Sequence, residues 1–160
     1  MKYNAQYIQT MTSKSTKGDD MSLNYFIDVI APKLQIYDCV NANTIDPYSI
    51  YDMSGIFNSN PIYIESKTRK GVSSTDYPDA MLSVNKFNNL RKLSIMRNGY
   101  SCYVCFYTDC WCMWNVNDDK QINRWGNVKH SKTTEFSNHK TVTEYCPFFK
   151  IDKKYNYIYE

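Results

Sequence analysis

The chain is organised around residues 49–70, SIYDMSGIFNSNPIYIESKTRK. It predicts two strands joined by a turn, the first from Ser49 to Met53 and the second from Pro61 to Arg69. Gly55 and the run Asn58-Ser59-Asn60 mark the turn between them. A proline is tolerated at the first residue of a strand, where Pro61 stands. We therefore expect a hairpin near the middle of the chain.

The side chains of this hairpin predict a charged patch. Because side chains alternate across a strand, Glu65, Lys67 and Arg69 share one face of the second strand. Asp52 lies on the first strand and comes near Glu65 if the two strands pair antiparallel. Two carboxylates and a lysine then converge on one patch. Such a patch suits a hard divalent cation, which binds one or two carboxylates together with water and phosphate.

Asp52, twelve further positions and then Glu65-Ser66-Lys67 resemble the motif of the PD-(D/E)xK nuclease superfamily. Tyr51 stands where the motif usually has its proline. The resemblance implies a deoxyribonuclease that uses Mg²⁺, with Mn²⁺ as a substitute, to hydrolyse DNA phosphodiester bonds. It also implies that Asp52, Glu65 and the Ser66 carbonyl hold the metal. Lys67 would position or activate the attacking water.

The family often carries a glutamate on its first helix, close to the metal. Here residues 21–31 predict that helix, which Pro32 ends. The helix has no glutamate, and Asp19 at its start is the best-placed substitute as a metal ligand, with Asp20 next. Both aspartates also suit the N-terminal cap and first turn of a helix, so the two interpretations stay open.

Three basic residues extend the resemblance to phosphate binding: Arg69, Lys70 and Lys86 are the expected DNA contacts. A second helix is predicted from Pro78 or Asp79 to about Asn98, and Lys86 falls inside its apolar stripe. A lysine in such a place must extend to solvent or find an anion. In the family a polar residue of this helix often reaches the active site, and Lys86 suits that role.

The remaining pattern places these motifs in an α/β fold. Strands are predicted over 34–40, 102–106 and 110–116, in addition to the hairpin. Over roughly residues 19–107 the order is α-β-β-β-α-β, the restriction-endonuclease-like core, and C-terminal strands would extend its mixed central sheet. Residues 1–17 are polar and predict an N-terminal arm, so that residues 18–160 form a single nuclease-like domain.

Composition sets the broad class. The 160 residues carry a net charge of +3, too little to indicate a nucleic-acid partner by itself. No apolar run approaches the roughly 20 residues of a membrane span, and no signal-peptide core is present. We expect a cytoplasmic protein whose six cysteines are thiols, without a membrane partner. The abundance of Asn, Lys, Tyr and Ile suits an AT-rich genome such as that of a phage, which would place the protein in host cytoplasm.

A cysteine cluster offers a competing site. Cys102, Cys105, Cys110 and Cys112 have spacings that zinc or redox sites use. In a regular strand, however, Cys102 and Cys105 point to opposite faces, so we predict neither a metal nor a required disulfide there. His130 and His139 lie in a polar segment, and nothing near them in the sequence supports a Cys–His nucleophile.

The expected function is a structure-selective endonuclease acting in recombination, repair or phage DNA processing. Two alternatives remain. The first is a module of the same fold with a weakened site, which binds nucleic acid or a protein. The second is a small viral structural protein in which the motif is accidental. The absence of a first-helix glutamate favours the binding module, while Asp52, Glu65 and Lys67 favour the enzyme. The resemblance also leaves a homodimer open.

Overall fold

The computed structural model describes residues 2–15, 20–130 and 142–159. The helices are α1 (Ala5–Thr12), α2 (Asp20–Tyr25), a π-helical turn (Phe26–Ile30), α3 (Ala31–Lys33) and α4 (Val84–Met96). The strands are β1 (Tyr37–Asn41), β2 (Met53–Phe57), β3 (Asn60–Thr68), β4 (Asp79–Met81), β5 (Tyr100–Phe106), β6 (Cys110–Asn115), β7 (Ile122–His130), β8 (Val142–Lys150) and β9 (Asn156–Ile158).

Six of these strands form the central sheet, in the order β1-β2-β3-β5-β6-β9. β3 and β5 are parallel and the other neighbours are antiparallel, so the sheet is mixed. Because α4 connects β3 to β5, it serves as the crossover that parallel strands require. The first helices, β1, β2, β3, α4 and β5 follow the predicted α-β-β-β-α-β order, and β6 and β9 extend the sheet. The predicted fold class is thus confirmed.

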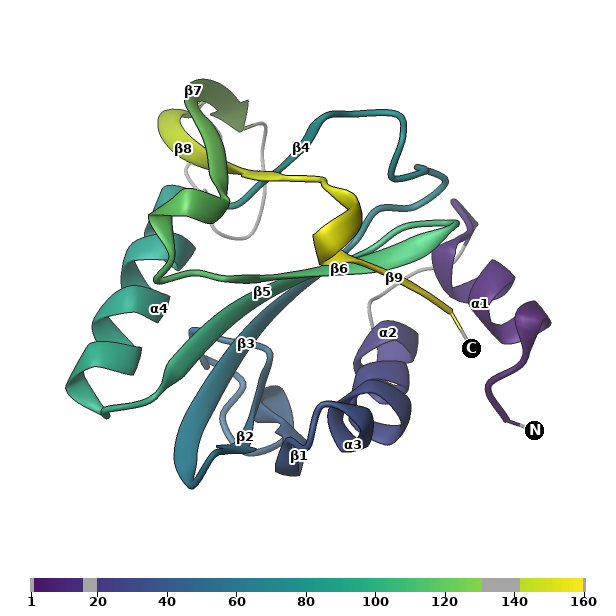
Figure 1. Ribbon diagram of the computed structural model, residues 1–160, viewed down its shortest axis with the longest axis horizontal. Coiled ribbons are helices and arrows are strands. Elements are labelled where there is room, and N and C mark those ends of the chain that lie inside the picture. The colour runs from purple at the N-terminus through teal and green to yellow at the C-terminus, as the bar shows by residue number, and fades with distance from the viewer. Residues whose placement is uncertain (1, 16–19, 131–141, 160) are drawn as a thin grey trace.

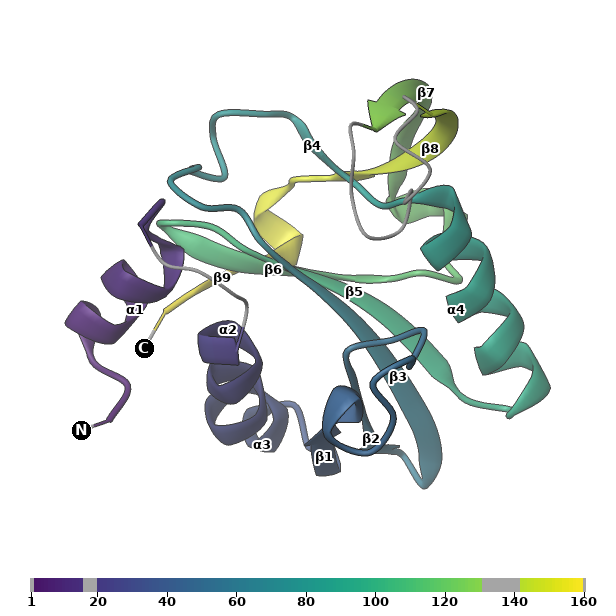
Figure 2. The same cartoon turned by 180° about the vertical axis from the view of Figure 1, so that it is seen from behind.

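The sheet separates two hydrophobic cores, with helices on both sides (Figures 1 and 2). The first core lies on the side of α1, α2 and α3, and the second lies under α4 and a small sheet ordered β4-β8-β7. Alternation along β3 divides its residues accordingly: Ile62 and Ile64 belong to the first core and Tyr63 to the second. Glu65 follows the parity of Tyr63, which directs it to the α4 side.

The hairpin differs from its prediction in the first strand. β2 begins at Met53, so residues 49–52 precede the strand instead of forming it. Gly55 lies inside β2 and not in the turn. A Cβ there would stand 2.9 Å from the Tyr37 carbonyl oxygen of β1, so the close approach of β1 requires a glycine. The predicted turn at Asn58 and Ser59 is confirmed, and both residues have positive φ, 47° and 65°, as a tight hairpin turn requires.

The first helix also runs past its predicted end. α2, the π-helical turn and α3 continue to Lys33, with Pro32 at the start of α3. A proline lacks the N–H that an interior helical position donates, and the wider π-helical turn immediately before it changes the hydrogen-bonding pattern at that point. Because Gln35 then takes a positive φ of 58°, the strand predicted from residue 34 begins only at Tyr37.

Two further segments differ from expectation. The helix predicted from residue 78 or 79 begins at Val84, since Asp79–Met81 pair with β8 as strand β4. Within the segment expected to be an N-terminal arm, α1 forms a helix whose Met11 is fully buried in the first core. The predicted boundary between residues 17 and 18 falls outside the described residues.

Candidate functional site

An ion pair joins the buried Glu65 of β3 to Lys86 of α4. Glu65 is 3% exposed, and its Oε1 accepts a hydrogen bond from the Nζ of Lys86. The Lys86 side chain is 41% exposed, so the ion pair is only partly shielded from solvent. A buried carboxylate is costly without a cation. Lys86 supplies that cation. Of the two possibilities expected for a lysine in the apolar stripe, solvent or an anion, the structure shows contact with an anion.

Asp52 sits beside the residue that follows Glu65. Its backbone N–H donates to the Ile64 carbonyl at 3.0 Å, one position beyond the last β2–β3 pair. Its Oδ2 accepts from the Ser66 backbone N–H at 2.8 Å and from the Ser66 hydroxyl at 3.0 Å. Within the described residues, Oδ1 accepts no hydrogen bond. Asp52 is therefore held at β3 through its Oδ2.

Lys67 follows on the same strand and is exposed. By alternation it lies on the face of Glu65, two residues away. The structure gives its ammonium no hydrogen bond or ion pair within residues 2–15, 20–130 and 142–159. On the same face of β3, the rings of Tyr51 and Tyr63 lie 5.0 Å apart. Lys67 thus presents a positive charge to solvent on the Glu65 face of β3, whereas Asp52 contacts Ser66, whose side chain belongs to the other face.

The other two predicted DNA contacts are used within the fold. The Nη2 of Arg69 donates to the Met81 carbonyl at 3.0 Å and to the Tyr103 hydroxyl at 3.2 Å. The neighbouring Tyr103 raises the pKa of the Arg69 guanidinium, against the opposing effect of burial. The Nζ of Lys70 donates to the Met11 carbonyl at 2.8 Å, in the last turn of α1. Arg69 therefore ties β3 to β4, and Lys70 holds α1.

Of the two first-helix candidates for a metal ligand, Asp20 is the one that the structure describes. Asp19 lies outside the described residues, and Asp20 is exposed at the start of α2. α2 packs on the first core, on the side of the sheet away from α4. Thr68 shows this contact, because its hydroxyl donates to the Ser22 hydroxyl at 2.7 Å. Within the described residues, Asp52 is thus the carboxylate bonded to Ser66, while Glu65 is paired with Lys86.

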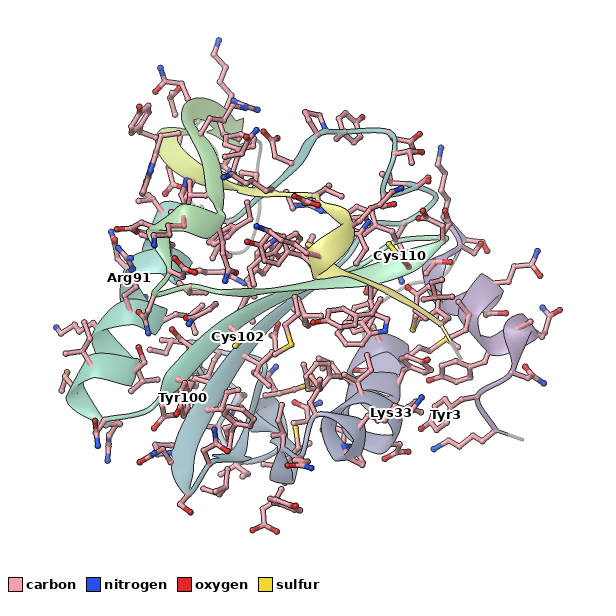
Figure 3. The ribbon with its side chains drawn as sticks, viewed as in Figure 1. Tyr3, Lys33, Arg91, Tyr100, Cys102 and Cys110 are labelled. Carbon is pink, nitrogen blue, oxygen red and sulfur yellow. The ribbon has the colours of Figure 1, made fainter. Side chains whose placement is uncertain are left out.

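The cysteine cluster is divided between the two cores, as strand alternation predicts. Cys102, labelled in Figure 3, packs against the first core, whereas Cys105, Cys110 and Cys112 belong to the second. Burial raises the pKa of the Cys102 thiol to about 12. Cys102 thus lies on the other side of the sheet from Cys105, Cys110 and Cys112 and does not share a site with them.

A second group of donors was missed by sequence reasoning. His130, Glu144 and Cys146 bring one ligand atom each to within 4.8 Å of one another. The spacing of Glu144 and Cys146 places them on one side of a strand, which is a readable signal. His130 is fourteen positions before Glu144 and joins them only through the pairing of β7 with β8, which was not predicted.

The described part of the chain contains no helix that is both long and apolar enough to cross a membrane. Neither a protein-family model nor a curated protein matches the chain. Among solved structures, the chain is similar to that of Archaeoglobus fulgidus Hjc, a Holliday junction resolvase from an archaeal hyperthermophile. The similarity covers 79% of this chain and 87% of that one, with 13% sequence identity and a TM-score of 0.47.

Proposed function

We propose that this chain is a metal-dependent nuclease that hydrolyses DNA phosphodiester bonds, with its site in a single domain over residues 18–160. One observation carries the proposal. At the junction of β2 and β3, Asp52 is bonded to Ser66, the neighbour of Glu65, while Lys67 stays exposed on the same strand. In this proposal Asp52, Glu65 and Lys67 form one patch, which a phosphodiester would approach from the side where Lys67 is exposed.

The donors fit Mg²⁺, and Mn²⁺ as a substitute, because they are all oxygens. Asp52, Glu65 and the Ser66 carbonyl would hold the ion. The Glu65 carboxylate is paired with the Lys86 ammonium, so an ion bound by Glu65 would have to displace that lysine. When bound, the ion would acidify a water and offset charge on the phosphate.

The two lysines of the patch have separate tasks in this proposal. Lys67 would orient the attacking water or offset the charge that develops on the phosphate. Lys86 would exchange its Glu65 contact for a phosphate oxygen. Arg69 and Lys70 are given no part, since the Met81 and Met11 carbonyls already accept their hydrogen bonds. Structure-selective cleavage in recombination or repair is the finer form of the proposal.

A second candidate is a module of the same fold that binds nucleic acid or a protein without cleaving it. The Lys86–Glu65 ion pair favours this alternative. A lysine held on the carboxylate neutralises the charge that a metal needs, so the patch would be cationic towards a partner.

The test compares cleavage of branched, duplex and single-stranded DNA with Mg²⁺, Mn²⁺ or EDTA. Glu65→Gln removes a metal ligand and Lys67→Ala removes the exposed charge, so each should slow cleavage by about 100-fold or more. Lys92→Ala, an exposed lysine on α4, is the matched control and should cleave normally. DNA binding by Lys67→Ala should persist and weaken as salt rises.

Two outcomes would change the interpretation. If the wild-type protein cuts none of these DNAs with either metal, the binding module is the better description. If it cuts and Glu65→Gln cuts equally well, the site is misplaced even though the reaction class is right.

A further inference from the structure

The β7–β8 hairpin, beside the N-terminal end of α4 (Figure 1), holds a separate set of metal-type side chains. His130 ends β7, and Glu144 and Cys146 lie two residues apart on β8, on one side of that strand. The register pairs Val128 with Glu144, which places His130 diagonally across from the carboxylate. All three are shielded: the His130 side chain is 14% exposed, that of Glu144 8%, and Cys146 is fully buried.

The three donor atoms are spaced like the corners of a metal tetrahedron. His130 Nε2 lies 3.0 Å from Glu144 Oε2, Cys146 Sγ lies 3.7 Å from the same oxygen, and Sγ lies 3.9 Å from Nε2. Zinc bond lengths and tetrahedral angles give edges of about 3.3 Å for N to O and about 3.5 Å for sulfur to either. Small side-chain adjustments of a few tenths of an ångström therefore accommodate the ion.

The same contacts exclude a nucleophilic triad. In a triad the acid binds one imidazole nitrogen and the nucleophile faces the other, so that a proton can pass between them. Here Nε2 of His130 faces both the Glu144 carboxylate and the Cys146 thiol. Cys146 is also fully buried, so no substrate reaches it. Three donors that converge on one point describe a coordination site instead.

An outer layer of hydrogen bonds orients the carboxylate. The Ser83 hydroxyl donates to Glu144 Oε2 and the Asn85 amide donates to Oε1, both at 3.4 Å. Ser83 and Asn85 belong to the cap and first turn of α4. Metal ligands are commonly held by such outer partners. An ion bound here would thus connect the small sheet to the helix that carries Lys86.

We propose that His130, Glu144 and Cys146 bind one zinc ion, with a water as the fourth ligand. The inference does not depend on the nuclease proposal. A thiolate, an imidazole and a carboxylate form a donor set that suits Zn²⁺ and is unsuited to Mg²⁺ or Ca²⁺, which prefer oxygen ligands only. In the bound state the Glu144 carboxylate and the Cys146 thiolate would together carry the negative charge that a divalent cation offsets. The ion would also link β7 to β8 and so stabilise the hairpin.

The experiment uses the full chain without an affinity tag, purified without chelator and under reducing conditions. We expect one equivalent of zinc by elemental analysis. After replacement by Co²⁺, the protein should show the visible bands of a tetrahedral ion and a thiolate-to-cobalt charge-transfer band. Cys146→Ser should lose the charge-transfer band and bind Zn²⁺ at least tenfold more weakly. Cys39→Ser, a half-buried thiol of β1, is the matched control and should behave as wild type.

Asn85→Ala provides a readout that leaves the three ligands intact, and it should lower zinc affinity roughly tenfold. The wild-type cobalt spectrum decides the matter even if a ligand variant fails to fold. A spectrum without a thiolate band, or a zinc equivalent retained in Cys146→Ser, would overturn the proposal. Zinc content well below one equivalent in wild-type protein that does not take up Co²⁺ would do the same.

Discussion

Replacing Lys86 with methionine tests how the Glu65 carboxylate is stabilised. Methionine keeps most of the lysine stem and removes the ammonium that donates to Glu65. The carboxylate is 3% exposed, so water cannot replace the lost partner easily. We therefore expect Lys86→Met to destabilise the metal-free protein more than the same substitution at Lys92, an exposed lysine of α4.

The size of the effect follows from the burial of the two partners. Removing one member of a fully buried ion pair costs about 3–5 kcal/mol. Lys86 is 41% exposed, so solvent already screens part of the attraction, and we reduce the expected cost to about 2 kcal/mol. For a domain of this size that lowers the melting temperature by about 4–8 °C.

The reverse substitution should cost less. Glu65→Gln leaves Lys86 without its carboxylate, but a partly exposed lysine can turn to solvent, so about 1 kcal/mol is expected. The double variant Lys86→Met/Glu65→Gln carries neither charge, so no charged group is left without a partner. Urea unfolding of the wild type, both single variants and the double variant in EDTA gives the coupling energy, which should exceed about 1 kcal/mol. Lys92→Met, on the exposed face of α4, is the control. Additive single effects would refute the argument.

Two further predictions concern stability elsewhere. Gly99→Ala should destabilise the fold by about 1–3 kcal/mol in urea unfolding, because a Cβ there overlaps the Pro61 carbonyl oxygen; Gly126→Ala, which meets only the flexible end of Arg124 and a Phe148 ring atom, should cost less. Burial acts to raise the pKa of Asp109, but hydrogen bonds from Ser74 prevail and lower it. Stability from a lowered pKa is present above the unfolded value and is lost as pH falls through the folded value. The stability gap between wild type and Asp109→Asn should therefore shrink as urea midpoints are measured from pH 6 to pH 3, and a constant gap would contradict this.

Much of the central fold could be predicted because local rules and the fold agree there. Strand alternation put Glu65 on a different face from Ile64, and the two cores on either side of the sheet follow that division. The Asn58-Ser59 turn needed residues that tolerate positive φ, and the sequence supplied them. Lys86 was expected to need an anion or solvent because it interrupts an apolar stripe, and it forms an ion pair with Glu65.

The rest depends on contacts between distant parts of the chain. Gly55 suggests a turn locally, yet it lies within β2, where β1 approaches too closely for a side chain. Asp79 suggests a helix start, but it pairs with β8 as part of strand β4. The Nε of Arg124 lies 2.9 Å from its Oδ2. The donors at His130 and Glu144 meet only through cross-strand register. None of these partners can be identified from the neighbouring sequence.

The Lys86–Glu65 pair also distinguishes the two proposed functions, because it makes metal binding a competition. An ion bound by Glu65 and Asp52 must displace the Lys86 ammonium, which then needs an anion such as a DNA phosphate. Lys86→Met removes the competitor, so Mg²⁺ should raise the urea midpoint of this variant more than that of wild type, through binding to the folded state alone. Glu65→Gln removes a ligand and should show the smallest Mg²⁺ effect of the three. Equal Mg²⁺ effects in all three proteins would mean that Glu65 does not bind the ion, and the patch would then be better explained as a cationic surface for a partner.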